Sequence, residues 1–357
     1  MTAAGLRDSH GRVMKDLRVS ITDRCNFRCL YCLPETEEAA RFYRAKFDAL
    51  RNPKPVALTP IRYEWKPKEH LLTYEEIERL VRIAAGLGVE KVRVTGGEPL
   101  LRHGVPELLV KLAAIAGIRD LAMTTNGFLF ARHAEALRAA GLRRVSFSMD
   151  SLDPVNFKKM TGREGLAEVL AGIAQAKQLG FSPVKVNAVV IRGLNDHEIE
   201  ALAAFAREHD LSLRFIEFMP LDSGHAWQKE MVVSGREILG RLRARFDLVP
   251  VDQSGNPAET ARRWAFADGR GEVGIIAPVT EPFCGHCNRL RLTADGKLRT
   301  CLFSLEEHDL KPLLRGDATD DDIAAELVGL VAHKEAGHRI GKADFVQPAR
   351  TMSCIGG

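Results

Sequence analysis

Cysteines are the residues of this chain with the most evident chemistry, because six of the seven fall into two triplets. The triplets are Cys25, Cys29 and Cys32 near the start, and Cys284, Cys287 and Cys301 further along. Cys354 stands alone near the end. The first residues include no apolar leader, so we expect no signal peptide. An odd number of clustered cysteines in such a chain argues against a disulfide framework and favours metal or redox sites.

The spacing Cys25-x3-Cys29-x2-Cys32 allows three thiolates to converge on one metal centre, either a zinc ion or an iron–sulfur cluster. Structural zinc prefers four ligands in a closed site, and no fourth ligand is near in sequence, because the next histidine is His70. A four-iron cluster that is held by three thiolates leaves one iron free for another ligand. Such an open iron is a catalytic arrangement.

Short β-branched runs alternate with helical segments between the triplets, which predicts a parallel sheet with right-handed crossovers. The predicted strands are residues 17–22, 91–95, 120–124, 144–149, 184–191 and 213–218. Six strand–helix units are short of the eight of a closed barrel. We therefore expect an α/β fold with an incomplete (βα)6 TIM-like barrel.

Helix signals separate these strands. Thr73 and Glu76 form a predicted capping box at the start of the first helix. Further helices are predicted at about residues 105–116, 131–140, 165–179 and 196–208. Four of the helices end at a glycine, as a left-handed cap favours; these glycines are Gly88, Gly117, Gly141 and Gly180.

Polar residues gather where the predicted strands end. They are residues 95–98, 124–126, 148–150, Asn187 and 217–219. A strand end can be polar simply because it leads into a loop. In a βα barrel, however, this edge forms the active-site face. Because five units share the pattern, we favour a common pocket.

The pattern changes after about residue 222. Ser234 and Glu237 predict another capped helix, and shorter β-like runs follow, with a hairpin turn at residues 294–296. We expect a small C-terminal α+β domain that carries the second triplet. The predicted division is residues 1–225 with an insertion at about 35–68, then residues 226–341, and then an irregular tail at 342–357.

Composition excludes several classes of protein. The chain has 357 residues, 45% hydrophobic and 27% charged, which does not fit a disordered or fibrous protein. No apolar run reaches the ~18 residues of a membrane span. The net charge of +4 is too small to indicate nucleic-acid binding, but it suits an anionic small molecule. We expect a cytoplasmic protein with no membrane or nucleic-acid partner.

Two motifs carry a family resemblance. The segment from Cys25 to Cys32, with aromatic Tyr31, resembles the CxxxCxΦC motif of the radical S-adenosylmethionine superfamily, and Gly96-Gly97-Glu98-Pro99 resembles its GGE motif. Nearly the whole chain resembles the GTP 3′,8-cyclase family of molybdenum cofactor biosynthesis. This closer likeness rests on residues 16–25, the second triplet with residues 288–298, and the final Gly356-Gly357.

The resemblance implies two [4Fe-4S] clusters and assigns residues to them. Cys25, Cys29 and Cys32 would bind the cluster that chelates S-adenosylmethionine. The cofactor contacts would be Tyr31, Gly97, Ser148 and Met219. Cys284, Cys287 and Cys301 would bind a second cluster, which meets the purine of GTP. The substrate-binding residues would be Arg18, Arg93, Thr124, Lys185, Arg289, Leu290 and Arg291. Gly356 and Gly357 would reach into the active site.

The implied activity is a radical cyclisation by a lyase. A 5′-deoxyadenosyl radical takes the hydrogen from carbon 3′ of GTP. The resulting carbon radical attacks carbon 8, which gives (8S)-3′,8-cyclo-7,8-dihydroguanosine 5′-triphosphate. The implied partners are an electron donor and the downstream cyclic pyranopterin monophosphate synthase, with a homodimer as a further possibility.

Two alternatives and two departures stay open. The chain could be another radical enzyme with an auxiliary cluster, such as a peptide-modifying one. It could instead be a nucleic-acid-binding zinc ribbon, completed by His308 or Cys354. The stretch 35–68 is longer than the family's usual link, and a lid, an interface and a disordered insert are all compatible with it. Cys354 lies outside the family motif, and we expect it near the second triplet.

Overall fold

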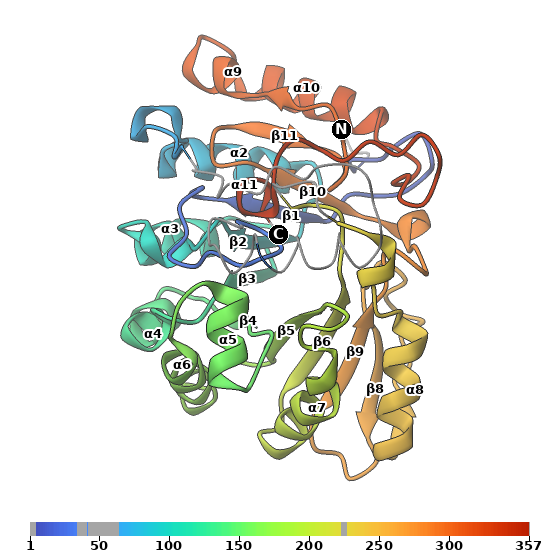
Figure 1. The fold of residues 1–357 in the computed structure, drawn as a ribbon. Helices are drawn as coiled ribbons and strands as arrows, with labels where there is room; N and C mark the ends of the chain where they lie inside the picture. The colour runs from blue at the N-terminus through green and yellow to red at the C-terminus, as the bar shows by residue number, and fades with distance from the viewer. Residues whose placement is uncertain (1–4, 34–40, 42–63, 223–226, 357) are drawn as a thin grey trace.

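A computed structural model describes residues 5–33, 41, 64–222 and 227–356 (Figure 1). Most of the predicted insertion at 35–68, and Gly357, lie outside the described residues. Within those ranges, no helix has the length and apolar character needed to cross a membrane.

Six parallel strands follow one another in chain order, which confirms the predicted barrel units. They are β1 (Asp16–Ser20), β2 (Lys91–Thr95), β3 (Asp120–Thr125), β4 (Arg144–Ser148), β5 (Val184–Val190) and β6 (Ser212–Glu217). Each pairs in parallel with the next. The observed ends differ from the predicted ones by at most one residue, except that β1 ends at Ser20 and not at Thr22.

The C-terminal segment lengthens this same sheet instead of forming a separate one. β9 (Glu272–Ile276) pairs in parallel with β6, and β10 (Arg289–Leu292) pairs in parallel with β1. Antiparallel strands continue outward from each, namely β8 (Arg262–Phe266) and β7 (Leu248–Pro250) on one side, and β11 (Lys297–Arg299) and β12 (His308–Asp309) on the other. An incomplete barrel has two edges with unpaired backbone groups, and β9 and β10 satisfy them. The division at residues 225 and 226 stays a prediction.

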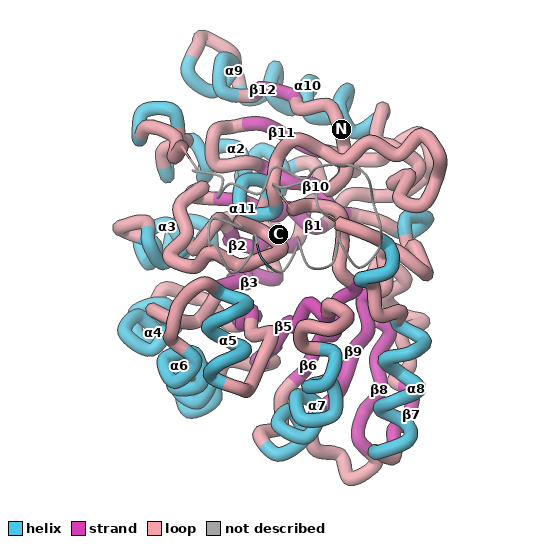
Figure 2. Tube along the Cα trace, viewed as in Figure 1, coloured by secondary structure: helices cyan, strands magenta, loops and turns pink. Residues whose placement is uncertain are grey.

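Helices cover the outer side of the sheet (Figures 1 and 2). The α-helices are α2 (Tyr74–Gly86), α3 (Val105–Ala113), α4 (Phe130–Ala139), α5 (Pro154–Thr161), α6 (Leu166–Gln178), α7 (Ile199–Glu208), α8 (Gly235–Arg245), α9 (Lys311–Arg315), α10 (Asp320–Ala332) and α11 (Met352–Ile355). Short 3-10 turns are η1 (Lys68–His70), η2 (Pro99–Leu101), η3 (Asp196–Glu198), η4 (Lys229–Met231) and η5 (Cys284–His286). Helix α11 lies in the tail that the sequence predicts to be irregular.

The helix caps follow the predicted signals with one exception. Thr73 and Glu76 form the reciprocal capping box of α2. Ser234 caps α8 by accepting from the Glu237 N–H, but the Glu237 carboxylate pairs with Arg192 instead of returning to the cap. The four predicted terminal glycines have φ values from 72° to 98°, in the left-handed region.

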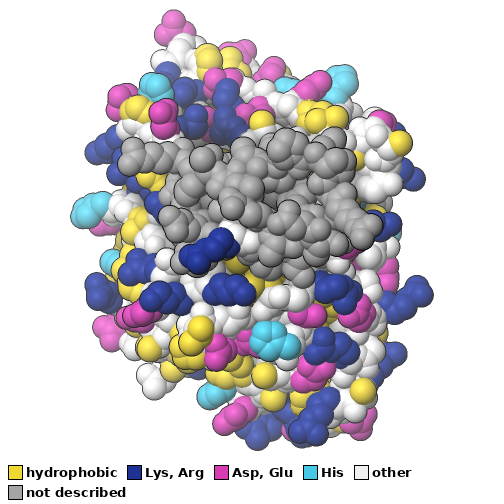
Figure 3. All heavy atoms as spheres, viewed as in Figure 1, with side chains coloured by type: hydrophobic (Ala, Val, Ile, Leu, Met, Phe, Trp, Pro, Cys, Tyr) yellow, Lys and Arg dark blue, Asp and Glu magenta, His cyan; other side chains and the backbone are white. Residues whose placement is uncertain are grey.

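The two faces of the barrel sheet differ in polarity, because side chains alternate along each strand. On β1, Leu17 and Val19 are buried in the main apolar core. Arg18 lies between them in sequence and faces the interior cavity of the barrel. On the face of the molecule that Figure 3 shows, Lys and Arg are interspersed with Asp and Glu among the described residues.

A buried carboxylate ties the end of β6 to the C-terminal segment. Glu217 accepts hydrogen bonds from the N–H groups of Gly235 (2.7 Å), Val279 (2.9 Å) and Thr280 (2.9 Å). These donors belong to the start of α8 and to the loop after β9. Glu217 therefore has a structural role at the strand end, where the sequence indicates a polar cluster.

Replacing Glu217 with alanine should destabilise the protein by about 3 kcal/mol, because three N–H donors lose their acceptor. Urea unfolding of cluster-free protein, followed by circular dichroism, measures the effect. The matched control is Glu281→Ala, which removes the partly exposed pair with Arg262 and should cost less than about 1 kcal/mol. Equal shifts in the two variants would contradict the role given to Glu217.

Candidate active site

The first cysteine triplet lies on the loop after β1, and the main chain of α5 holds that loop in place. The N–H groups of Arg28 and Leu30 donate to the carbonyls of Thr161 (2.7 Å) and Met160 (2.9 Å). Phe27 is buried and packs edge-on against Phe128 and Phe157. The loop is therefore fixed at its middle, between the first and third cysteines.

The three thiols of this loop are close enough for their charges to affect one another. Burial raises the pKa of Cys29, and the neighbouring Cys25, Asp150 and Cys32 raise it further. Burial likewise raises the pKa of Cys25 to about 11 and that of Cys32 to about 12. Three mutually repelling thiolates are costly unless a cation compensates them. Thiolate ligands around a positively charged iron centre fit this arrangement.

The residues expected to contact the cofactor come from this loop and from the ends of several barrel strands. The Tyr31 hydroxyl donates to Asp150 (2.6 Å). Ser148 ends β4 beside Asn187 of β5, which lines the interior cavity. Met219 lines that cavity as well.

The packing of the cysteine loop requires a glycine at position 97. A Cβ at Gly97 would lie 2.3 Å from the carbonyl oxygen of Arg24, so the glycine allows the cysteine loop to pack on the end of β2. Next to it, Glu98 is buried and accepts from Leu100 N, Thr125 Oγ1 and Asn126 N. Burial raises the pKa of Glu98 to about 7. The GGE segment thus connects the cysteine loop with the ends of β2 and β3.

A single cavity inside the barrel brings together most of the predicted substrate residues and the second triplet. Its lining includes Arg18, Arg93, Thr124, Lys185, Arg289, Arg291, Cys284, Cys287 and Cys301. Leu290 is the exception, because its side chain points to the opposite side of β10 and is buried in the apolar core. The structure therefore does not place the Leu290 side chain with the others.

Strand register places three arginines side by side on the inner face. Arg18 of β1 is the partner of Arg291 on β10 and of Arg93 on β2. Burial lowers the pKa of Arg18, and the positive charge of Arg291 lowers it further. Among the described residues, the Arg93 side chain donates to the neutral hydroxyls of Thr124 (3.2 Å) and Ser146 (3.1 Å), and Arg18 Nε has no hydrogen-bond partner. Asp16 offsets part of the positive charge of all three arginines, and Asp120 part of that of Arg93. Positive charge still exceeds negative charge in the row.

Two further cations extend the row across the barrel. Burial, followed by the charges of Arg214, Arg144 and Arg93, lowers the pKa of Lys185 to about 7. Arg214 lines the same cavity, although the sequence interpretation missed it. It is partly compensated by Glu272 (3.0 Å) and Glu259 (3.6 Å). Strand alternation was the available signal, because Arg214 is a charged residue at an inward position of a predicted strand.

In the second triplet, Cys287 lies among positive charges, whereas burial and Glu335 raise the pKa of Cys301. Cys284 and Cys287 lie on the loop from β9 to β10, and Cys301 follows β11. Burial alone would raise the pKa of Cys287, but Arg289, Lys334 and Arg291 outweigh it and lower the pKa to about 7. Lys334 is buried, and its ammonium donates to the carbonyls of Arg289 and Thr300. These cations favour the thiolate form that an iron–sulfur cluster requires.

The positions of the His, Cys, Asp and Glu side chains also test the alternative of a zinc site. Across the described parts of the chain, no three His, Cys, Asp or Glu side chains gather closely enough to hold one metal ion. Cys354 lies beside Cys32 of the first triplet, where it contributes to the raised pKa of Cys32. The expectation that Cys354 lies near the second triplet is therefore wrong, and the reason is that the tail folds back over the first cysteine loop.

Gly356, in the C-terminal tail, contacts Arg291 of the cavity lining. Arg291 donates to the Gly356 carbonyl. Gly356 has a φ of 70°, and a Cβ there would lie 2.7 Å from Thr95 Oγ1, so a side chain would collide with the strand. Gly357 lies outside the described residues.

In cluster-free protein at pH 7, iodoacetamide should modify Cys287 at least about tenfold faster than Cys25, because only Cys287 has a large thiolate fraction. The rate at Cys287 should rise through a midpoint near its pKa of about 7. Peptide mass spectrometry over a time course measures both rates. Equal rates at the two cysteines would contradict the contrast between the two environments.

Family models match consecutive parts of the chain. Residues 19–206 match the radical SAM superfamily, and residues 211–340 match the family described as Molybdenum Cofactor Synthesis C. Among solved structures, SuiB of Streptococcus suis bound to S-adenosylmethionine has a TM-score of 0.59 at 14% identity. That match covers 91% of this chain and 69% of SuiB. It shows a shared fold.

Relatives of known name match over nearly the full length. The chain is 46% identical to a GTP 3′,8-cyclase of Streptomyces coelicolor, covering 99% of this chain and 96% of the relative. It is 45% identical to GTP 3′,8-cyclase 2 of Mycobacterium tuberculosis, covering 100% and 93%. A GTP 3′,8-cyclase of Rhodopirellula baltica is 44% identical, covering 99% and 92%. Together with the two cysteine triplets on one barrel, these matches mean that the chain belongs to the GTP 3′,8-cyclase family of the radical S-adenosylmethionine superfamily.

Proposed function

We propose that this chain converts GTP to (8S)-3′,8-cyclo-7,8-dihydroguanosine 5′-triphosphate, the first step of molybdenum cofactor biosynthesis. The observation that carries the proposal is the row of buried cations that shares one cavity with the second cysteine triplet. The family establishes the class of enzyme, and the cavity indicates how a nucleoside triphosphate is held.

The cation row suits a triphosphate. A buried charge without a partner is costly, and Arg18, Arg93 and Arg291 stand next to one another with few carboxylates to compensate them. A triphosphate carries several negative charges and many acceptor oxygens, which guanidinium groups bind well. The lowered pKa of Lys185 has the same cause, and a bound anion would raise it again.

The purine has apolar side chains to pack against beside the second triplet. Phe283, Phe303 and Ile276 line the cavity beside the second triplet, and a flat aromatic base packs well against such side chains. We propose that Cys284, Cys287 and Cys301 hold a second [4Fe-4S] cluster there. The cations around Cys287 favour its thiolate form, which supports this assignment.

The first triplet would hold the [4Fe-4S] cluster that binds S-adenosylmethionine. When bound, this pair supplies a 5′-deoxyadenosyl radical for hydrogen abstraction. The protein contributes position and shielding from water. The cysteine loop is fixed on α5, and the tail carbonyl of Gly356 fixes Arg291 in orientation.

The alternatives gain less support. SuiB shares the fold at 14% identity, which says nothing about a common substrate. A zinc ribbon would need four ligands around one ion, and Cys354 lies beside the first triplet instead of completing the second. Cytoplasmic location, a homodimer, the electron donor and the downstream synthase stay predictions.

Replacing each cysteine triplet with serine separates the two cluster sites. After anaerobic reconstitution, the unchanged protein should contain about eight irons and each triple variant about four. The variant at Cys25, Cys29 and Cys32 should lose cleavage of S-adenosylmethionine. The variant at Cys284, Cys287 and Cys301 should keep some cleavage but form no cyclised nucleotide. Stoichiometric zinc without sulfide in the unchanged protein would overturn the proposal.

Arg289→Ala should weaken GTP binding by at least about tenfold, because a charge-assisted contact to phosphate is lost. Isothermal titration of anaerobic protein measures the affinity. Iron and sulfide content must match the unchanged protein, because Arg289 also contributes to the environment of Cys287. The control is Arg243→Ala on the exposed face of α8, which should leave the affinity unaltered. Unchanged GTP affinity in Arg289→Ala would count against the phosphate assignment.

A further inference from the structure

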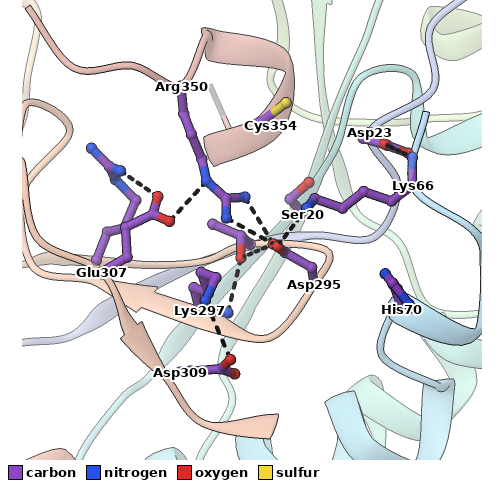
Figure 4. Close-up of polar contacts among 12 residues, drawn as sticks. Ser20, Asp23, Lys66, His70, Asp295, Lys297, Glu307, Asp309, Arg350 and Cys354 are labelled. Atoms are coloured by element: carbon purple, nitrogen blue, oxygen red, sulfur yellow. Dashed lines mark hydrogen bonds and ion pairs between the residues drawn. The ribbon is translucent and has the colours of Figure 1, made fainter. Parts of the chain in front are cut away.

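Asp295 lies in the turn between β10 and β11 and receives cations from two distant parts of the chain (Figure 4). Its carboxylate forms a two-pronged pair with Arg350, with distances of 2.9 and 3.0 Å. Lys66 Nζ lies 3.1 Å from the same carboxylate. Thr293 Oγ1 also donates to it (2.6 Å). Asp295 is only 4% exposed, so these contacts are shielded from water.

Arg350 fastens the C-terminal tail to the hairpin of β10 and β11. Arg350 also pairs with Glu307, because its Nε lies 2.8 Å from Glu307 Oε2. Bidentate, partly buried guanidinium–carboxylate pairs are among the stronger polar contacts. Arg350 directly precedes the segment that leads through α11 to Gly356, whose carbonyl accepts from Arg291. The tail is therefore held at both ends by one hairpin.

The tail between these two fastenings covers the first triplet. Ser353 lies beside the Cys32 sulfur, where its backbone and its side chain lower the pKa of that thiol. Cys354 lies beside the same sulfur. A tail that is held at Arg350 and Gly356 thus connects the second-triplet hairpin with the loop of the first triplet.

Lys66 brings a second segment to the same carboxylate. Its backbone N–H donates to Asp23 Oδ2 (2.7 Å), and its ammonium pairs with Asp295. The guanidinium of Arg28 lies 5.1 Å from the ring centre of Trp65. Asp23 and Arg28 flank the first cysteine of the cluster loop. Residues 64–66 are therefore held both by that loop and by Asp295, the residue that also holds Arg350 of the tail.

We propose that Asp295 is a positioning residue for the cyclisation, which fastens the tail through Arg350 and residues 64–66 through Lys66. This role rests on the proposed function, because a fixed tail holds Arg291 and shields the cavity while the substrate radical cyclises. Loss of the anchor should let the substrate radical escape cyclisation without disturbing either cluster.

Hydrogen exchange of the full-length, reconstituted protein tests the fastening. Asp295→Asn keeps the shape but removes the charge, and it should speed exchange in residues 350–356 and 64–68 by at least about tenfold. Arg350→Met should affect only the tail, and Lys66→Met only residues 64–68, so the test does not depend on Asp295→Asn folding. Asp309→Asn is the matched control, because it removes the Lys297 pair from the same hairpin. If the amide hydrogens of residues 350–356 exchange no faster in Arg350→Met than in the unchanged protein, the proposal is overturned.

The ratio of cyclised nucleotide to 5′-deoxyadenosine tests the role in the reaction. Arg350→Met should lower this ratio at least about fivefold at full iron content, and Arg350→Lys should restore part of it. A purely structural role would lower both products together, which would overturn the proposal. If the unchanged protein forms no cyclised nucleotide, the proposed function fails, whereas the exchange experiment still decides the fastening.

Discussion

Buried positive charge inside the barrel is the constraint on which the rest of the structure depends. Arg18, Arg93 and Arg291 lie next to one another in strand register, and burial opposes the charge of each. Such a row is stable only if the outer face of the same strands is firmly apolar and the inner face meets an anion. Leu17 and Leu290 supply the apolar face, and the proposed triphosphate would meet the second condition.

The same constraint explains why the C-terminal segment joins the barrel sheet. Arg291 can stand beside Arg18 only if β10 pairs in parallel with β1. That pairing also sets the loop from β9 to β10 across the barrel mouth, and this loop carries Cys284 and Cys287. One arrangement of strands, with β9 on β6 and β10 on β1, therefore has three consequences. It pairs the open edges of the barrel, completes the cation row and places the second triplet.

Local patterns predicted much of this, and non-local pairing accounts for the rest. The six barrel strands, the capping box at Thr73 and the terminal glycines follow from periodicity and backbone preferences. The pairing of β9 and β10 with the barrel joins residues that are far apart in sequence, and no local signal specifies it. Arg214 was missed because one charged residue on a strand is usually solvent-facing. Cys354 was misplaced because the path of the tail depends on the Asp295 contact with Arg350.

One thiol in each triplet shows how differently the two sites are charged. Around Cys29, burial and the neighbouring Cys25, Asp150 and Cys32 raise the thiol pKa. Around Cys287, Arg289 and Lys334 outweigh burial and lower the thiol pKa to about 7, although burial and Glu335 raise the pKa of Cys301 in the same triplet. The proposed second cluster would therefore stand beside the cations of the substrate cavity, and the proposed S-adenosylmethionine cluster would stand apart from them, because charge stabilisation at short range depends on which groups are desolvated together.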